Sequence, residues 1–172
     1  NVAFVWAPNY ASSPNPSDPQ YAWNHWSNYY PGDRYVDWVG IDVYDFSGQD
    51  PADSIQPFYD EYANRKPILL AETAGHYDSG VNADKERYIG ELFDAMENQY
   101  PRIKGFVWFN IRQPDYNWRI EETPESLAAY QSRVADSRYI GLVDETMADT
   151  DGDGVPDPCD NCPERDNADQ AD

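Results

Sequence analysis

Four short apolar runs, separated by stretches with helical periodicity, dominate the pattern of hydrophobic and polar positions along the chain. The runs cover Val2–Ala7, Tyr35–Tyr44, Pro67–Glu72 and Ile103–Ile111. Nearly continuous apolar runs of this kind are typical of strands that are buried on both faces of a parallel sheet. We therefore predict four buried parallel strands.

Helical patterns lie between and after these runs. They cover Asp53–Ala63 and about Ala83–Gln99, with a shorter one near Tyr21–Tyr29. A further helix is predicted to begin at Pro124, because Thr123 can cap it and proline is favoured at the first helical position. The residues expected to face the core have helical spacing: Ile89, Leu92, Phe93 and Met96 in the second helix, and Leu127, Tyr130 and Val134 in the last.

The alternation of strands and helices predicts an α/β fold with a parallel sheet and right-handed crossovers. Four strand–helix units have the size of half an eight-stranded (β/α)8 barrel, and they also fit a small open sheet. We expect residues 1–143 to form this domain and residues 144–172 to form a separate tail.

A carboxylate ends the third apolar run. Glu72 follows Ile68–Ala71 directly, and a strand that is apolar to its end rarely carries an unpaired charge there, because burying such a charge is costly. The carboxyl ends of parallel strands are where α/β barrels and doubly wound sheets place their chemistry. Glu72 is therefore a candidate catalytic residue, and strict strand alternation puts it on the same face as Ile68 and Leu70.

Two other strand ends carry polar and aromatic residues. Asp42 and Tyr44 share one face of the second strand, and Trp108 and Asn110 share one face of the fourth. Carboxylates, orienting hydroxyl or amide groups and flat aromatic rings together suit a polysaccharide site. Asp42 also fits a loop-capping role, and Trp108 also fits core packing.

Composition narrows the partners that the chain can bind. The formal net charge is −20, and aromatic residues make up 15% of the sequence. Residues 144–172 contain eleven acidic residues and one basic residue. Such an acidic surface disfavours nucleic acid and anionic membranes. We expect no nucleic-acid partner and no membrane insertion, and the negative charge favours cations or neutral substrates as partners. No run approaches the length of a membrane span.

The chain contains two histidines. His76 lies four positions after Glu72 and could line the site, although a surface-loop position is the more ordinary interpretation. His25 lies in an aromatic-rich loop, and no catalytic role is expected for it. The two are far apart in sequence, and without a third ligand they do not indicate a transition-metal site.

Several segments, taken in order and spacing, resemble glycoside hydrolase family 26. The strongest are Tyr35–Tyr44, Lys66–Glu72 and Lys104–Asn110, and Phe4–Asn9, Tyr30–Asp33 and Asp115–Ile120 add to them. The resemblance covers roughly residues 1–138 and corresponds to the C-terminal half of the catalytic domain. It implies a partial (β/α)8 TIM barrel, in which the four strands are the last four of eight, and retaining hydrolysis of β-mannan, β-xylan or β-glucan.

The resemblance also implies roles for individual residues. Glu72 matches the nucleophile, and Tyr44 matches the tyrosine that hydrogen-bonds the nucleophile. Trp108 matches the aromatic platform beneath the sugar, and Asp42 shares the motif of Tyr44 and is expected to support the rim. The residues expected to bind substrate are Trp108, Asp42, Asn110 and Trp6.

The family's general acid/base is a glutamate on the strand before the first one present here. Retaining hydrolysis needs two carboxyl groups about 5–5.5 Å apart, and Glu72 supplies only one. The chain begins with Asn1, without Met, and enters an apolar run at once. We therefore expect a fragment of a secreted β-mannanase-like endo-β-glycanase that has little activity alone.

The alternative is a non-catalytic extracellular module that binds glycan through the barrel segment and uses its acidic tail for adhesion or spacing. The residue at the tip of the strand that precedes Asn1 would discriminate between the two. Glutamate there supports the enzyme, and alanine or glutamine supports the binding module.

The acidic tail contains a candidate calcium site. Asp149, Asp151 and Asp153 fall at every second position, with glycines that permit a tight loop, and this spacing suits a cation that needs six to eight oxygen ligands. A disordered acidic linker is the alternative. The segment resembles a truncated thrombospondin type 3 repeat, which implies structural Ca²⁺ held by Asp149, Asp151, Asp153, Asp157 and Asp160, with a backbone carbonyl near Val155.

Cys159 and Cys162 are the only cysteines of the chain. Their spacing fits a redox pair, half a zinc site or a small disulfide loop. The disulfide is expected, which implies an oxidising, extracellular or cell-surface setting. Thrombospondin-type repeats can pair cysteines differently, so the partner of each cysteine stays open.

Overall fold

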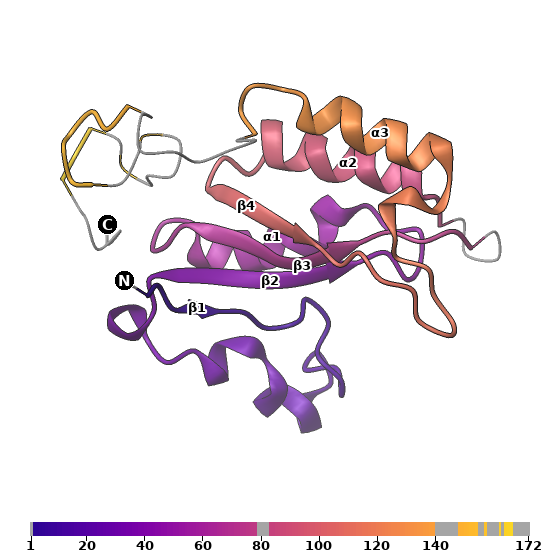
Figure 1. Cartoon of the computed structure of the whole chain (residues 1–172). Helices are drawn as coiled ribbons and strands as arrows, with labels where there is room; N and C mark the ends of the chain where they lie inside the picture. The colour runs from indigo at the N-terminus through magenta and orange to yellow at the C-terminus, as the bar shows by residue number, and fades with distance from the viewer. Residues whose placement is uncertain are drawn as a thin grey trace.

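A four-stranded parallel sheet forms the centre of the protein (Figure 1). The computed structural model describes residues 2–78, 83–139 and 148–154, together with residues 157, 162 and 164–166. The strands follow the chain across the sheet in the order β1-β2-β3-β4, and every neighbouring pair is parallel. Their bounds are β1 Val5–Trp6, β2 Trp38–Tyr44, β3 Ile68–Ala74 and β4 Ile103–Trp108.

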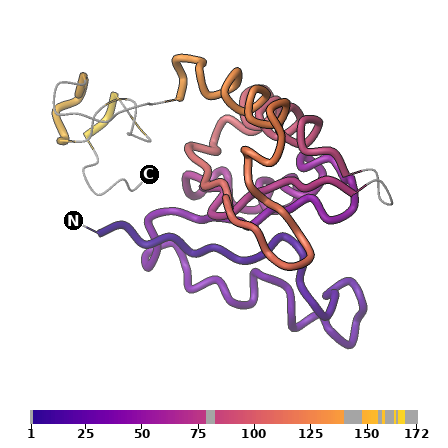
Figure 2. The backbone as a smooth tube through the Cα atoms, turned by 45° about the vertical axis from the view of Figure 1, so that its right-hand side comes forward, coloured from indigo at the N-terminus to yellow at the C-terminus, as the bar shows by residue number. Residues whose placement is uncertain are grey.

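Within the described residues, three α-helices connect and cover these strands: α1 (Pro51–Tyr62), α2 (Lys85–Asn98) and α3 (Pro124–Val134). Figures 1 and 2 show α3 beside α2. Side chains cap all three N-termini, because Asp50, Asp84 and Thr123 each accept a hydrogen bond from a backbone amide of the first turn. The short 3₁₀ helices are η1 Pro19–Asn24, η2 Trp26–Tyr29, η3 Asp33–Tyr35 and η4 Ile120–Glu122.

The core lies between the sheet and the helices α1 and α2. The buried side chains of β2 and β3 meet apolar side chains of both helices, and α3 adds the ring of Tyr130 beside Phe93. The buried residues that form this layer include Val39, Ile41 and Val43 of β2, Ile68 and Leu70 of β3, Ile55 and Phe58 of α1, and Ile89, Leu92 and Phe93 of α2.

On the opposite face of the sheet, β2 and β3 lie close together at Gly40, and some apolar side chains are exposed. A Cβ atom on Gly40 would lie 3.1 Å from the Leu69 carbonyl oxygen and 3.2 Å from the Ala71 Cβ, so this position favours glycine. Val5 and Val107, on the two edge strands, are exposed.

None of the helices in the described part of the chain combines the length and the apolar character that a membrane span needs.

The predicted elements are confirmed, with differences at their ends. All four strands are present, but β1 has two residues instead of the six expected over Val2–Ala7. The helix expected near Tyr21–Tyr29 is two 3₁₀ helices, which suits a segment rich in Pro, Ser and Asn. Thr123 and Pro124 begin α3 as predicted.

Candidate active site

Tyr44 and Glu72 meet at the carboxyl-terminal edge of the sheet. Their strands, β2 and β3, run parallel, and Asp42 is the register partner of Glu72. The Tyr44 hydroxyl donates a hydrogen bond of 2.5 Å to Oε2 of Glu72. The contact that the family resemblance implies between these two residues is therefore present, and it holds the carboxylate in one orientation.

A β-bulge in β3 precedes Glu72. Ile41 of β2 pairs with Leu70 of β3, but the next residue of β2, Asp42, pairs with Glu72. The third strand therefore contains one extra residue, Ala71, at this point. Such an insertion changes the alternation of side chains between the two faces, and bulges are frequent beside active sites.

The bulge decides which face Glu72 occupies. Thr73 is fully buried, and its hydroxyl is hydrogen-bonded to the hydroxyl of Tyr88 on α2 at 2.6 Å. Thr73 thus continues the helix-packed side of Leu70, and Glu72 lies on the other side, with Tyr44. The prediction that Glu72 shares a face with Leu70 is wrong, because strict alternation does not hold across the bulge.

Asp42 places a second carboxyl group beside Glu72. Burial is the main reason that the pKa of Asp42 is raised to about 6, and the negative charge of Glu72 raises this pKa further. A hydrogen bond with the Glu72 backbone lowers it and offsets part of the effect. Asp42 therefore takes up a proton at a higher pH than an exposed aspartate, which relieves the repulsion between two neighbouring carboxylates.

Aromatic rings surround Tyr44. The ring centroids of Phe109 and Trp118 lie 5.8 Å and 5.2 Å from that of Tyr44, both in T-shaped contact. Burial, followed by the hydrogen bond to Glu72, raises the pKa of Tyr44 far above its usual range. The hydroxyl therefore keeps its proton and remains a donor to the Glu72 carboxylate.

An aromatic cluster of Phe46, His76, Tyr116 and Trp118 extends this environment. Trp118 and Tyr116 are stacked with centroids 5.0 Å apart, and Phe46 contacts both of them at 5.3 and 5.5 Å. His76 is only 5% exposed, so its expected surface position is wrong. The sequence signals for the cluster were weak: Phe46 lies two residues after Tyr44, and the segment Asp115–Ile120 belongs to the family resemblance.

A buried lysine holds the loop that carries Tyr116 and Trp118. The Nζ atom of Lys85 donates hydrogen bonds to the carbonyl oxygens of Asn117 and Arg119, at 3.0 and 2.7 Å, and to Oε2 of Glu122 at 2.6 Å. Burial lowers the pKa of Lys85, and the hydrogen bond with Glu122 opposes this shift. The ammonium group thus joins the start of α2 to the loop between β4 and α3.

Trp108 lies in the layer between the sheet and the helices. It is 9% exposed and packs between Tyr88 of α2 and Tyr130 of α3, with centroid distances of 6.2 and 5.8 Å. Its indole N–H donates to the Trp118 carbonyl oxygen at 2.8 Å. The Trp108 side chain therefore belongs to the sheet–helix layer, in line with the core-packing alternative, and its role as a sugar platform stays a prediction.

Trp6 is also turned toward the helices. It pairs in register with Val39, whose side chain is in the core, and its ring lies 6.1 Å from Phe58 and 5.6 Å from Tyr62 of α1. Glu72 faces the opposite side of the sheet. The Trp6 ring therefore packs against α1, and its predicted contact with substrate stays a prediction.

Asn110 fastens the loop that follows β4. Its side-chain oxygen accepts a hydrogen bond of 2.7 Å from the Ile120 amide, and its Nδ2 donates to Glu121 at 3.1 Å. The preceding residue, Phe109, is the one that contacts Tyr44. Asn110 thus stabilises the loop, and a contact with substrate remains a prediction.

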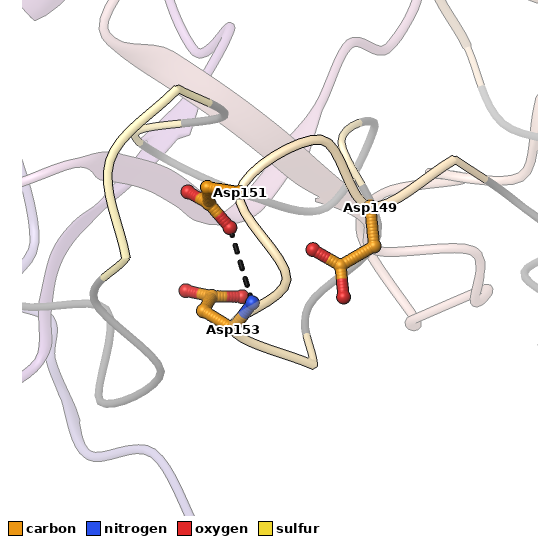
Figure 3. A group of neighbouring side chains, drawn as sticks. All are labelled: Asp149, Asp151 and Asp153. Carbon is orange, nitrogen blue, oxygen red and sulfur yellow. Dashed lines mark hydrogen bonds between the residues drawn. The ribbon is translucent and has the colours of Figure 1, made fainter.

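Three aspartates of the tail lie around one turn (Figure 3). One carboxylate oxygen from each of Asp149, Asp151 and Asp153 lies within 4.8 Å of the others. Gly152 and Gly154 have φ angles of 81° and 91°, which glycine adopts without strain. Carboxylate oxygens in such an arrangement are the donors that a hard cation such as Ca²⁺ prefers, so the donor set fits this ion.

The other predicted metal ligands stand apart from this group or lie outside the described residues. Asp157 accepts two hydrogen bonds of 2.7 Å from Thr150, one from its amide and one from its hydroxyl. Val155 and Asp160 lie outside the described residues, and so does Cys159. The structure therefore does not test the pairing of Cys159 with Cys162.

A carboxylate held by tyrosine at the carboxyl-terminal edge of a parallel sheet, among aromatic rings, is an arrangement that suits a carbohydrate-hydrolysing α/β enzyme. The family model described as glycosyl hydrolase family 26 matches residues 4–130, and the chain belongs to this family. Endoglucanase H of Acetivibrio thermocellus is 31% identical over 115 residues, which are 62% of this chain and 12% of that relative. The chain thus spans a small part of the relative's length.

Two solved structures show more distant similarity. A GH128 (subgroup VI) exo-β-1,3-glucanase from Aureobasidium namibiae has a TM-score of 0.38 and 20% identity, over 53% of this chain and 34% of that chain. A β-glucuronidase from Faecalibacterium prausnitzii has a TM-score of 0.48 and 15% identity, over 79% of this chain and 32% of that chain.

Proposed function

We propose that the chain is part of a secreted retaining endo-β-glycanase and that Glu72 is its nucleophile. The observation that carries this proposal is the hydrogen bond from Tyr44 to Glu72 at the carboxyl-terminal edge of the sheet, in a member of glycosyl hydrolase family 26. The Glu72 carboxylate attacks the anomeric carbon as the glycosidic C–O bond breaks, and a glycosyl ester forms. Water then hydrolyses this ester and restores the carboxylate.

The second carboxyl group comes, in this proposal, from a strand outside the 172 residues. It protonates the leaving oxygen and later removes a proton from the attacking water. Asp42 is not assigned this role, because it is the register neighbour of Glu72 on the adjacent strand, whereas the family resemblance implies an acid/base on a strand before β1. The four strands then correspond to the last four of a (β/α)8 barrel. The longer polypeptide that contains both carboxyl groups is the parent protein.

The substrate class in this proposal is a β-linked polysaccharide. Phe46 is 44% exposed beside Tyr44, so it offers a flat apolar face on which a sugar ring can stack. The sequence resemblance alone leaves β-mannan, β-xylan and β-glucan open. The relative's name, Endoglucanase H, supports β-glucan among the three.

The configuration of the first product tests the proposed mechanism. When the parent protein hydrolyses a β-glucan oligosaccharide, proton NMR should show the β-anomer of the new reducing end first, with the α-anomer appearing later by mutarotation. Two inversions at the anomeric carbon require this result. An α-anomer that appears first would exclude retention, and binding without turnover would favour the non-catalytic glycan-binding module.

We also propose that the acidic tail is a calcium-binding segment, as expected for an extracellular protein. The three carboxylates within 4.8 Å of one another support this proposal. Calorimetric titration with CaCl₂ should show that the unmodified tail binds calcium. The calcium affinity should be at least about tenfold lower in Asp151→Asn and in Asp153→Asn, because each change removes a charged oxygen ligand.

Asp166→Asn is the matched control for calcium binding. It removes the same charge at a described position outside the group of three aspartates, so binding should be nearly unchanged. Equal losses in Asp166→Asn and Asp153→Asn would show that general negative charge, and not a defined site, attracts the ion.

A further inference from the structure

His76 is a buried polar residue beside the candidate active site, and the proposed mechanism does not use it. It lies two residues after the end of β3 and only 5% of it is exposed. Its ring contacts are aromatic: Tyr116 at 5.1 Å, Trp118 at 5.2 Å and Phe46 at 6.5 Å between centroids.

One ring nitrogen of His76 lacks a hydrogen bond. Its Nδ1 atom is buried and has no partner among the described residues. A buried polar atom without a partner has lost its hydrogen bonds to water without replacement, so such an atom needs an explanation. The neighbouring Trp118, by contrast, donates its indole N–H to Gln113 at 3.0 Å. The unpaired nitrogen of His76 therefore belongs to the aromatic cluster whose Trp118 contacts Tyr44, the hydrogen-bond partner of the proposed nucleophile.

Phe46 links this histidine to the catalytic edge. Its ring is 5.8 Å from Tyr44 on one side and 6.5 Å from His76 on the other, and it is the exposed member of the cluster. A pyranose ring stacked on the exposed Phe46 therefore lies close both to the Tyr44–Glu72 pair and to His76. Each sugar hydroxyl can both donate and accept, so it can pair with either tautomer of a neutral imidazole.

We propose that His76 is a substrate-binding residue whose imidazole forms a hydrogen bond with a hydroxyl group of the sugar that stacks on Phe46. This inference rests on the proposed glycanase function and deepens it, because it assigns a specificity-determining contact. Binding requires the aromatic cluster to open slightly at Phe46, since Nδ1 is covered in the free protein. A site built to pair with a hydroxyl group discriminates strongly against sugars that lack it.

The ring nitrogens can be observed directly by NMR. The parent protein, labelled with ¹⁵N-histidine, is titrated with a β-1,4-linked glucose tetrasaccharide, and the signals of His76 and His25 are assigned by their loss in His76→Phe and His25→Phe. We expect the His76 ring signals to shift saturably and the His25 signals to remain unchanged. His25 is the internal control because its Nδ1 already contacts the Ser27 hydroxyl at 2.8 Å.

The substitution His76→Phe provides a second measurement. Phenylalanine keeps a ring in the cluster but has no nitrogen, so we expect an unchanged or higher unfolding temperature and an affinity for the tetrasaccharide about tenfold lower. A purely structural role would leave the affinity unchanged. If His76→Phe does not fold, the His76 signals are assigned by their loss in His76→Gln, and the titration of the unmodified protein decides the question.

Labelling of Glu72 by a mechanism-based glycosyl inactivator separates the two proposals. If Glu72 is labelled but the His76 signals do not shift, the inference about His76 is overturned and the glycanase function stands. If the His76 signals shift but Glu72 is not labelled, the contact between His76 and the glycan stands, and the assignment of Glu72 as the nucleophile is wrong. If neither occurs, both proposals fail.

Discussion

Replacing Glu72 with glutamine is expected to lower kcat/KM of the parent protein on β-glucan by about 10⁴-fold or more. Glutamine has nearly the same shape but is neutral, so it cannot form the glycosyl ester, and losses of this size are typical when a nucleophile is removed. The Tyr44 hydroxyl can still donate to the side-chain oxygen that replaces Oε2. The loss should therefore appear in kcat, with KM changed much less, in an assay of released reducing sugar.

A second tyrosine–glutamate pair provides the matched control. The Tyr77 hydroxyl donates a hydrogen bond to Glu86, which lies in the first turn of α2. Glu86→Gln removes the same charge from the same kind of pair, and the partners of Glu86 are Tyr77 and Thr123, so we expect activity within about twofold of the unmodified protein. Equal losses in Glu72→Gln and Glu86→Gln would indicate a general effect on folding or charge and would contradict the assigned role.

Replacing Lys85 with methionine is expected to destabilise the chain by about 3 kcal/mol. Methionine fills the space of the aliphatic stem but cannot donate to the carbonyl oxygens of Asn117 and Arg119 or to the Glu122 carboxylate. These three acceptors lose their shared partner when the ammonium group is removed. Urea unfolding, followed by tryptophan fluorescence, should show a clearly lower midpoint.

Lys104→Met is the control for this measurement. Lys104 is exposed on β4, so its replacement should change the free energy of unfolding by no more than about 0.5 kcal/mol. Because the Lys85 contacts hold the loop with Trp118, we also expect Lys85→Met to alter the fluorescence of the folded state. Equal midpoints for Lys85→Met and the unmodified chain would show that the buried ammonium group does not hold this loop.

The secondary structure could be predicted because it depends on local patterns. Continuous apolar runs marked the strands, and Thr123 with Pro124 marked the start of α3. Tyr44 and Glu72 could be found for the same reason, since each lies near the end of an apolar run. Their hydrogen bond followed from the family resemblance and the parallel pairing of β2 and β3.

The directions of side chains could not be predicted with the same success. The extra residue Ala71 reverses the alternation before Glu72, and no sequence signal marks the bulge. In a parallel sheet both faces are rich in apolar residues, so the pattern does not show which face Trp6 and Trp108 occupy. Both rings pack on the helix side of the sheet. The predicted contact with a sugar ring requires them on the other side, where Glu72 lies.

Contacts between distant segments were also invisible in the sequence. Lys85 reaches the carbonyl oxygens of a loop more than thirty positions later, and this contact depends on how α2 is placed on the sheet. His76 was expected on the surface because it follows a strand in a polar loop. It is buried because Tyr116 and Trp118, from a later loop, pack on its ring.

The most direct test of the account is covalent labelling of the parent protein with a 2-fluoro-glycosyl fluoride of a β-linked glucose disaccharide. Such a reagent forms the glycosyl ester but is hydrolysed slowly, so the modified peptide can be identified by mass spectrometry. We predict a single added disaccharide on Glu72 and none in Glu72→Gln. A label on any other residue, or full turnover by Glu72→Gln, would contradict the assignment of Glu72 as the nucleophile.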